Sequence, residues 1–180
     1  MRLAVVSDTH LPRFGRVLPR ALVDGFEREG IDRILHAGDW TTPLAVDLLS
    51  ELAPVDGVAG NNDGPELHER FGARRIVERD GARIGITHGH LGPGATTLDR
   101  ARHAFGDEPG LQAIVFGHSH VPLLRRPSPP GPRDAPGPWL INPGSPTDRR
   151  RRPTFTWVVV EIAWGRIARA ELIEYPRRDG

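Results

Sequence analysis

The chain has 180 residues, no cysteine and a formal net charge of +1, which excludes disulfides, thiolate metal ligands and a cysteine nucleophile. Its length suits a single domain over residues 1–180, and the nearly balanced charge favours no general binding to nucleic acid. Because the first apolar run is too short for a signal peptide and none reaches the about 20 residues of a membrane helix, we expect a cytoplasmic protein without a membrane partner.

The first half of the chain alternates short apolar runs with helical patterns. Strands are expected at Leu3–Val6, Ile31–His36 and Pro54–Ala59. Between them, apolar residues recur at helical spacing in two segments, Gly15–Glu29 and Pro43–Leu52. This βαβαβ order predicts an α/β domain with a parallel sheet.

The second half is richer in strands. Asp80-Gly81 is a strong hairpin signal between expected strands at Arg74–Glu78 and Ala82–Thr87. A helix is expected at Thr96–Phe105. Further strands are expected at Gln112–Phe116, Val121–Arg125, Trp139–Ile141, Thr154–Ile162 and Arg166–Glu174. The proline-rich segment 127–138 suits neither a ladder nor a helix, and we expect an exposed, mobile loop there.

Five short motifs directly follow predicted strands. They are Asp8-Thr9-His10, Gly38-Asp39, Gly60-Asn61-Asn62-Asp63, His88-Gly89-His90 and Gly117-His118-Ser119-His120. Because ligands of open α/β sheets bind at the carboxyl ends of the strands, we expect these motifs to meet at one edge. Each motif alone also fits an ordinary turn or loop. Gly-His-Ser-His is the most specific, because packing rarely needs histidines at i and i+2.

The residue types of the ordered set predict a metal site. Carboxylate, amide and imidazole groups together suit Mn, Fe, Zn, Co or Ni. The candidate ligands are Asp8, His10, Asp39, Asn61, His88, His118 and His120. This number is too large for one ion but suits two ions that share a carboxylate.

The ordered series D-x-H, GD, GN-x-D, H and GH-x-H resembles the calcineurin-like metallophosphoesterase superfamily. It is most similar to the compact bacterial and archaeal metallophosphodiesterases, and the segment Asn142-Pro143-Gly144-Ser145 strengthens that placement. The resemblance spans residues 3–175. It implies an α/β fold that is a four-layer α/β/β/α sandwich, in which two mixed β-sheets are flanked by helices.

The resemblance also implies how the ligands are shared. The first ion would be held by Asp8, His10, Asp39 and His120. The second ion would be held by Asp39, Asn61, His88 and His118. Asp39 would therefore bridge the pair. Mn²⁺ is the ion most expected, with Ni²⁺, Co²⁺, Fe or Zn²⁺ as alternatives.

The hypothesis for the reaction is hydrolysis of phosphoesters, diesters before monoesters, by a hydroxide that bridges the two ions. Asp39 would set the metal spacing, and Asn61 would contact a phosphate oxygen. His90 would bind phosphate or protonate the leaving group, although an ordinary polar loop histidine is an equally good interpretation. Many superfamily members have a histidine where this chain has Asn62, which leaves the general acid open.

Neighbouring residues are expected to support the site. Asp63 would orient a neighbour or cap its turn, and Asn142–Ser145 would form a turn near the site. His36 would either lie behind the ligands or be a histidine of the core. The basic run Arg149–Arg152 is interpreted as a solvated loop or as a guide for an anionic substrate.

The expected partner is a small phosphoester substrate. A nuclease is disfavoured because aromatic side chains that could stack on bases are sparse. The other alternative is a non-catalytic interaction scaffold on the same fold, which is disfavoured because every ligand position is filled. The sequence does not distinguish a monomer from a homo-oligomer.

Overall fold

The computed structural model of the chain describes residues 1–127 and 137–176. The loop expected over 127–138 falls mainly on positions 128–136, outside the described residues, and stays a prediction. Within the described residues, the strands form two mixed five-stranded sheets. None of the helices found in this part of the chain has the length and apolar character needed to cross a membrane.

The first sheet has the strand order β10-β9-β1-β2-β3. Its members are β1 (Arg2–Val6), β2 (Arg33–His36), β3 (Val55–Gly57), β9 (Phe155–Ala163) and β10 (Arg166–Tyr175). Strands β1, β2 and β3 are parallel, as the βαβαβ pattern predicts. β9 pairs antiparallel with β1, and β10 antiparallel with β9.

The second sheet has the order β4-β5-β6-β8-β7. Its members are β4 (Arg74–Arg79), β5 (Ala82–Thr87), β6 (Ala113–Val115), β7 (Leu123–Arg125) and β8 (Trp139–Asn142). Strands β5, β6 and β8 are parallel, whereas the edge strands β4 and β7 are antiparallel to their neighbours. Each sheet therefore contains three neighbouring parallel strands that end at the same edge.

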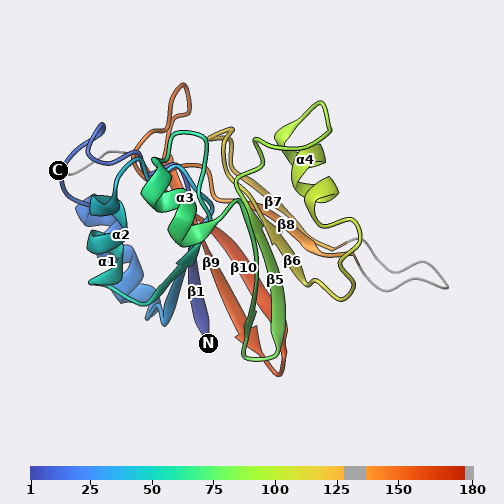
Figure 1. Ribbon diagram of the computed structural model, residues 1–180. Helices are drawn as coiled ribbons and strands as arrows, with labels where there is room; N and C mark the ends of the chain where they lie inside the picture. The colour runs from blue at the N-terminus through green and yellow to red at the C-terminus, as the bar shows by residue number, and fades with distance from the viewer. Residues whose placement is uncertain (128–136, 177–180) are drawn as a thin grey trace.

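Helices cover the two outer faces (Figure 1). They are α1 (Arg20–Glu29), α2 (Pro43–Ser50), α3 (Pro65–Phe71) and α4 (Thr97–Ala104). The first three share a hydrophobic cluster with the first sheet, and α4 packs on the second sheet. The expected four-layer α/β/β/α sandwich is therefore confirmed.

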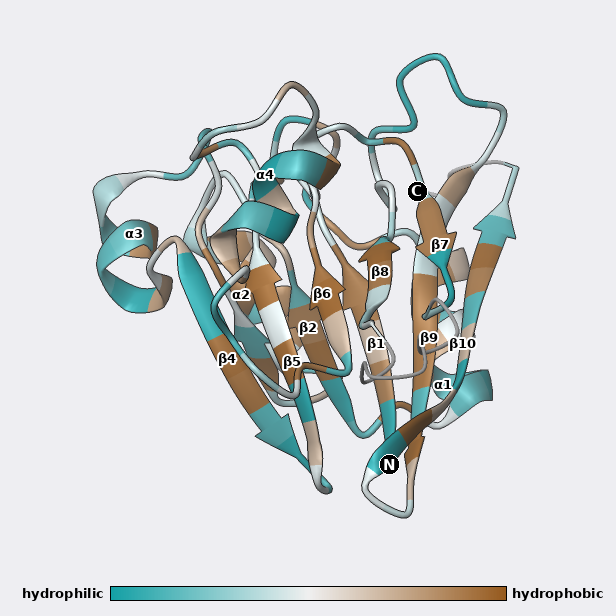
Figure 2. Cartoon of the chain, turned by 90° about the vertical axis from the view of Figure 1, so that its right-hand side faces the viewer, coloured by the Kyte–Doolittle hydropathy of each residue, from teal (hydrophilic) through white to brown (hydrophobic). Residues whose placement is uncertain are grey.

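Strand β1 shows how the layers are held together. Leu3 and Val5 are buried in the cluster between the sheets, and Ala4 and Val6 are buried against the helices. A strand covered on both faces needs a continuous apolar run, which is what this segment has. Figure 2 shows the same hydrophobic character along the central strands, whereas the edge strands β4 and β10 also contain hydrophilic segments.

Two helices differ from the sequence prediction. The helix expected from Gly15 begins only at Arg20, after Pro19 at the N-cap, because proline disfavours a helical conformation in the residue before it. The short helix α3 was not predicted. It buries only Leu67 and Phe71, a single i,i+4 repeat that gives too little periodicity to detect.

Candidate metal centre

The candidate ligands lie on loops that follow five strands of the two sheets. Asp8 and His10 follow β1, Asp39 follows β2, Asn61 lies beyond β3, His88 directly follows β5, and His118 and His120 follow β6. These loops meet at the upper edge in Figure 1, where parallel strands of both sheets end. The strand-end argument from the sequence therefore describes the geometry correctly.

The backbone at this edge is unusual. Five candidate ligands have a positive φ although none is glycine: Asp8 (56°), His10 (47°), Asp39 (61°), His118 (66°) and His120 (56°). A left-handed conformation costs an L-residue about 1–2 kcal/mol, and it persists only where the surroundings impose it. These strained backbone conformations therefore set the directions of the five side chains.

Asp8 is fully buried, and its two carboxylate oxygens have different surroundings. Oδ2 accepts hydrogen bonds from Ser7 Oγ (2.7 Å) and from the backbone N–H of His118 (3.0 Å). Oδ1 has no hydrogen-bond partner among the described residues. It lies 3.2 Å from His120 Nε2 and 3.9 Å from His10 Nε2. A buried carboxylate oxygen without a hydrogen bond is costly, and a cation at this point would satisfy it.

The two imidazoles beside Asp8 point at the same place. His10 Nε2 and His120 Nε2 are 3.3 Å apart, and their other nitrogens are occupied by the Thr41 hydroxyl (3.2 Å) and the Asp148 carbonyl (2.8 Å), respectively. Because a carbonyl can only accept, His120 Nδ1 carries the hydrogen and Nε2 is left for a ligand. Two imidazole nitrogens and a carboxylate oxygen fit a transition-metal ion.

Asp39 lies between two sets of histidines. Its Oδ2 is 3.3 Å from His88 Nε2 and 3.7 Å from His10 Nε2. Asn62 donates from its backbone N–H to Oδ1 (2.8 Å) and from its side-chain amide to Oδ2 (2.6 Å). Burial acts to raise the pKa of Asp39, but the hydrogen bond and charge of His88 outweigh it and keep that pKa below its usual range.

His88 has the same arrangement as His120. Its Nδ1 donates to the Ala37 carbonyl (2.7 Å), and its Nε2 faces Asn61 Oδ1 at 3.1 Å as well as Asp39. A neutral His88 would therefore direct a lone pair at two oxygens that can only accept. Either a proton or a metal cation must occupy this position. Burial lowers the pKa of His88, but Asp39 and Asp8 more than compensate and raise it.

The acidic and imidazole ligand atoms form two overlapping groups, each within a span of 4.8 Å. One consists of Asp8, His10 and His120, and the other of Asp8, Asp39 and His88. The first group holds three of the four ligands expected for the first ion. Asp8 belongs to both groups. Asp39 belongs to the second group, and its Oδ2 also lies 3.7 Å from His10 Nε2 of the first.

His118 and His90 lie at the more exposed side of the centre. The His118 ring is 5.1 Å from that of His88, and the His90 ring is 5.2 Å from that of His88 and 6.2 Å from that of His118. Nδ1 of His90 is buried and has no hydrogen-bond partner among the described residues. Burial, followed by the charges of His88 and His118, lowers the pKa of His90 to about 4, so this imidazole is neutral at pH 7.

The supporting residues named from the sequence also converge here. Asp63 accepts hydrogen bonds from the backbone N–H groups of Asp39 (3.0 Å), Gly60 (2.7 Å) and Thr41 (2.7 Å). It therefore fixes two ligand loops against each other rather than facing the ligand atoms. The buried His36 ring stacks on Trp40, with ring centroids 3.4 Å apart, and burial lowers the pKa of His36 to about 3.

Sequence reasoning missed the segment after the Asn-Pro-Gly-Ser turn. Ser145 Oγ donates to the Asp8 carbonyl (2.7 Å), and Thr147 Oγ1 donates to the Thr9 carbonyl (2.6 Å). Asp148 holds His120 through its carbonyl. The contacts of Ser145 and Thr147 join residues more than a hundred positions apart, and the only local signal was the turn motif itself.

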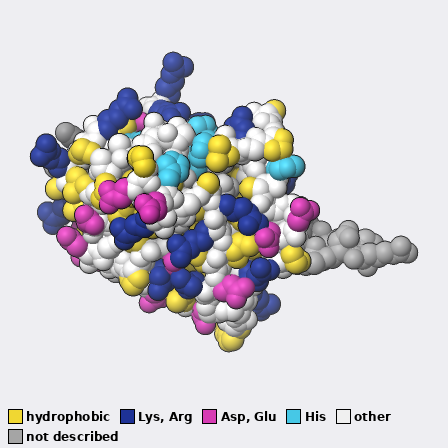
Figure 3. All heavy atoms as spheres, viewed as in Figure 1, with side chains coloured by type: hydrophobic (Ala, Val, Ile, Leu, Met, Phe, Trp, Pro, Cys, Tyr) yellow, Lys and Arg dark blue, Asp and Glu magenta, His cyan; other side chains and the backbone are white. Residues whose placement is uncertain are grey.

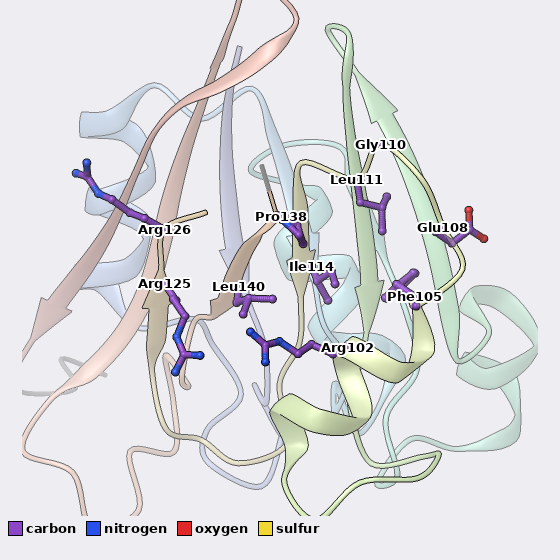
Figure 4. A pocket seen from close by; sticks show the side chains of 12 residues that line it. Arg102, Phe105, Glu108, Gly110, Leu111, Ile114, Arg125, Arg126, Pro138 and Leu140 are labelled. Carbon is purple, nitrogen blue, oxygen red and sulfur yellow. The ribbon is translucent and has the colours of Figure 1, made fainter. Parts of the chain in front are cut away.

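Two cavities border the candidate metal centre, and a third lies away from it. One of about 410 Å³ has His118 in its wall, and one of about 370 Å³ has His120 in its wall. The third, of about 350 Å³, lies beside α4 over an apolar floor that includes Leu140, with Arg102 and Arg125 at its rim (Figure 4). None of the candidate ligands lines this third cavity, and it contributes nothing to the metal centre.

The chain is similar in sequence and in fold to known proteins. A protein of Methanothermobacter thermautotrophicus named "Probable metallophosphoesterase" is 35% identical over 151 residues, which cover 82% of this chain and 78% of that protein. The structure of an archaeal phosphodiesterase superposes with a TM-score of 0.68 at 21% identity, covering 97% of this chain and 100% of that one. Zinc-bound Vps29 of Entamoeba histolytica gives 0.67 at 20% identity, with 97% and 99% covered.

The two solved structures show the likeness of the fold, and the sequence matches show the family. A family model for the calcineurin-like phosphoesterase superfamily domain matches residues 1–165. This match covers strands β1 to β9 and all the candidate ligands. The chain belongs to the calcineurin-like phosphoesterase superfamily.

Proposed function

We propose that the chain is a phosphodiesterase that uses two divalent cations, with Mn²⁺ the ion most expected. The proposed ligands are Asp8, His10, Asp39, Asn61, His88, His118 and His120. The observation on which the proposal mainly rests is the buried Asp8 Oδ1, which accepts no hydrogen bond from the described residues and faces two imidazole nitrogens. We also propose that the whole chain is one domain, with the centre open at its edge.

Two bound cations would polarise the phosphoryl oxygens and lower the pKa of a bound water. The chain's own residues prepare the site for them. The carbonyls of Ala37 and Asp148 fix the orientation of His88 and His120. Asp39 is held between the two ligand groups by Asn62. Asn61 directs its side-chain oxygen at His88, which leaves its amide N–H groups free to bind a phosphate oxygen.

His90 is proposed to position the phosphate rather than to donate a proton. Burial and the charges of His88 and His118 lower the pKa of His90, which favours the neutral ring at pH 7. The neutral ring still offers one N–H to a phosphate oxygen. Without a protonated acid at this place, esters with good leaving groups are expected to react fastest.

We propose that diesters are hydrolysed faster than monoesters. The similarity to the compact metallophosphodiesterases supports the same preference.

The test is a paired assay on the purified chain. After chelation, activity is measured with Mn²⁺, Ni²⁺, Co²⁺ or Zn²⁺ on bis(p-nitrophenyl) phosphate and on p-nitrophenyl phosphate. We expect metal to restore turnover, with the diester faster, and we expect Asp8→Asn to abolish the restoration. Faster monoester turnover would overturn the diester preference. No turnover with any metal would favour the interaction scaffold.

A further inference from the structure

We propose that the cavity beside His120 is an anion subsite, which selects substrates with a second phosphoryl group in addition to the scissile phosphoester. This inference rests on the proposed function. The cavity, of about 370 Å³, is lined by Ser119, His120, Val121, Arg150, Arg151 and Arg152. We call it the arginine groove.

The arginine groove shares a wall with the metal centre. The Nε2 of His120 faces Asp8 Oδ1 at 3.2 Å, while the opposite nitrogen, Nδ1, binds the Asp148 carbonyl at 2.8 Å. The turn with the arginines begins directly after Asp148. A molecule with one phosphoryl group at the metal centre can therefore extend past His120 into the groove. Figure 3 shows arginine side chains rising beside the histidines at this edge.

The groove has a strong excess of positive charge. Of the residues that the structure describes, three arginines and no acidic residue line it. The nearest carboxylate contact among the described residues is Asp148 Oδ2, which lies 3.9 Å from Arg150 Nε and 3.4 Å from His120 Nδ1. Even if Asp148 fully neutralises one arginine, two positive charges remain. Guanidinium groups bind phosphoryl oxygens with paired hydrogen bonds.

The turn is held in place, unlike a freely solvated loop. Asp148 donates its backbone N–H to Ser145 Oγ (2.8 Å), and its Oδ1 accepts from the backbone N–H of Arg150 (3.1 Å). The backbone N–H of Arg152 donates to the Arg149 carbonyl (2.9 Å). Arg150 has a positive φ of 49°, a strained conformation for a non-glycine residue.

One arginine of the run has a different task. The Arg149 guanidinium lies over the Phe155 ring, 5.8 Å from its centroid, and donates to the Arg152 carbonyl. It therefore braces the turn and is absent from the groove lining. Because Arg149 braces the turn whereas the next three arginines line the groove, we assign the anion subsite to Arg150–Arg152. A general attraction of anions to the whole run would not distinguish these residues.

The first test is binding, which does not depend on turnover. Inorganic phosphate is titrated into the full chain with Zn²⁺ bound, and again after chelation, while backbone amide and arginine Nε–H signals are followed by NMR. We expect saturable shifts at 119–121 and 150–152 that persist after chelation. In the double variant Arg150→Ser/Arg152→Ser the binding should weaken by about tenfold or more, as expected for losing charge-assisted hydrogen bonds. The absence of saturable shifts at these positions would overturn the proposal.

The second test compares two substrates that differ only by one phosphoryl group. They are thymidine 5′-(p-nitrophenyl phosphate) and the same compound with a 3′-phosphate. The wild-type chain should have the lower KM for the second, and the double variant should lose that discrimination while its kcat is unchanged. Arg100→Ser, in the cavity on the His118 side, is the matched control and should keep it.

If the double variant changes KM equally for both substrates and added salt removes this change, the arginines act only by long-range attraction. That result would reject the subsite. The phosphate titration tests the anion subsite even if neither compound is hydrolysed. A failure of the proposed function can therefore be distinguished from a failure of the subsite.

Discussion

The Nε2 atoms of His10 and His120 lie 3.3 Å apart, although the two residues are separated by 110 positions in the chain. Neither nitrogen can be satisfied by the other when both are unprotonated, and within the part of the chain that the structure describes the buried Asp8 Oδ1 beside them has no hydrogen bond. The arrangement of these three atoms fits a cation-binding site. The predictions below follow from that interpretation and from the packing around it.

Gly117 keeps space for Asp8. A Cβ at this position would come within 1.9 Å of Ser7 Oγ and 2.8 Å of Asp8 Oδ2. We expect Gly117→Ala to displace the carboxylate and to weaken metal binding by about tenfold or more, as changes that disturb ligand orientation do. Isothermal titration with Zn²⁺ measures this. Gly64→Ala, where a Cβ meets nothing within 4 Å, is the control; equal metal affinity in the two variants would contradict the explanation.

The pH dependence of stability should differ between metal-free and metal-bound protein. The pKa of His88 and of His120 is raised above 6.5, since nearby carboxylates outweigh burial. Their contribution is complete below pH 6.5 and is lost as the pH rises through the raised values. Burial lowers the pKa of His36 to about 3 and of His90 to about 4, so their contribution is complete above pH 6.5 and falls at lower pH.

The metal-free chain should therefore be most stable near pH 6.5. Bound metal holds its imidazole ligands unprotonated, and its affinity rises with pH, so the decline on the alkaline side should disappear. Urea unfolding from pH 5 to 8.5, with metal and with chelator, checks both curves. A metal-free stability that continued to rise above pH 7 would be inconsistent with protonated His88 and His120.

His90 should matter to the same extent for good and poor leaving groups. If the neutral ring positions phosphate, His90→Ala should reduce kcat/KM by about tenfold, the loss of one hydrogen bond to a charged group, for nitrophenyl and alkyl diesters alike. The exposed His68→Ala is the control. A loss confined to alkyl diesters would instead identify His90 as the general acid.

Asp56 joins the two sheets at their edges. This buried residue of β3 accepts hydrogen bonds from Arg33 in β2 (3.1 Å) and from Arg79 in β4 (2.6 Å). We expect Asp56→Asn to lower the free energy of unfolding by about 3 kcal/mol, since arginines lose their buried partner. Asp24→Asn, in an exposed pair with Arg20, should change it by about 0.5 kcal/mol or less. Similar losses in the two variants would refute this role.

The sequence predicted the parts of the fold that depend on local pattern. Leu3–Val6 is apolar throughout because both of its faces are buried, and that pattern is visible without a structure. Helix α3 was missed because seven residues with two buried side chains contain too little periodicity. The start of α1 was misplaced because the restriction imposed by Pro19 was overlooked.

The candidate site likewise has features that the sequence predicted and features that it did not. The ligand motifs were found because each follows a strand, and the structure brings them to one edge. The positions of Thr147 and Asp148 were not predictable, because their contacts with the loop after β1 and with His120 are made only when distant segments pack together. For the same reason, the proximity of Asp8 to both ligand groups was not foreseen.

The number of metal ions and their ligands test the central claim most directly. Crystals grown at neutral pH and soaked in Mn²⁺ should give two anomalous difference peaks about 3.5–4 Å apart. One peak should lie beside Asp8, His10 and His120, and the other beside Asp39 and His88. No peak, or peaks away from these side chains, would contradict the account.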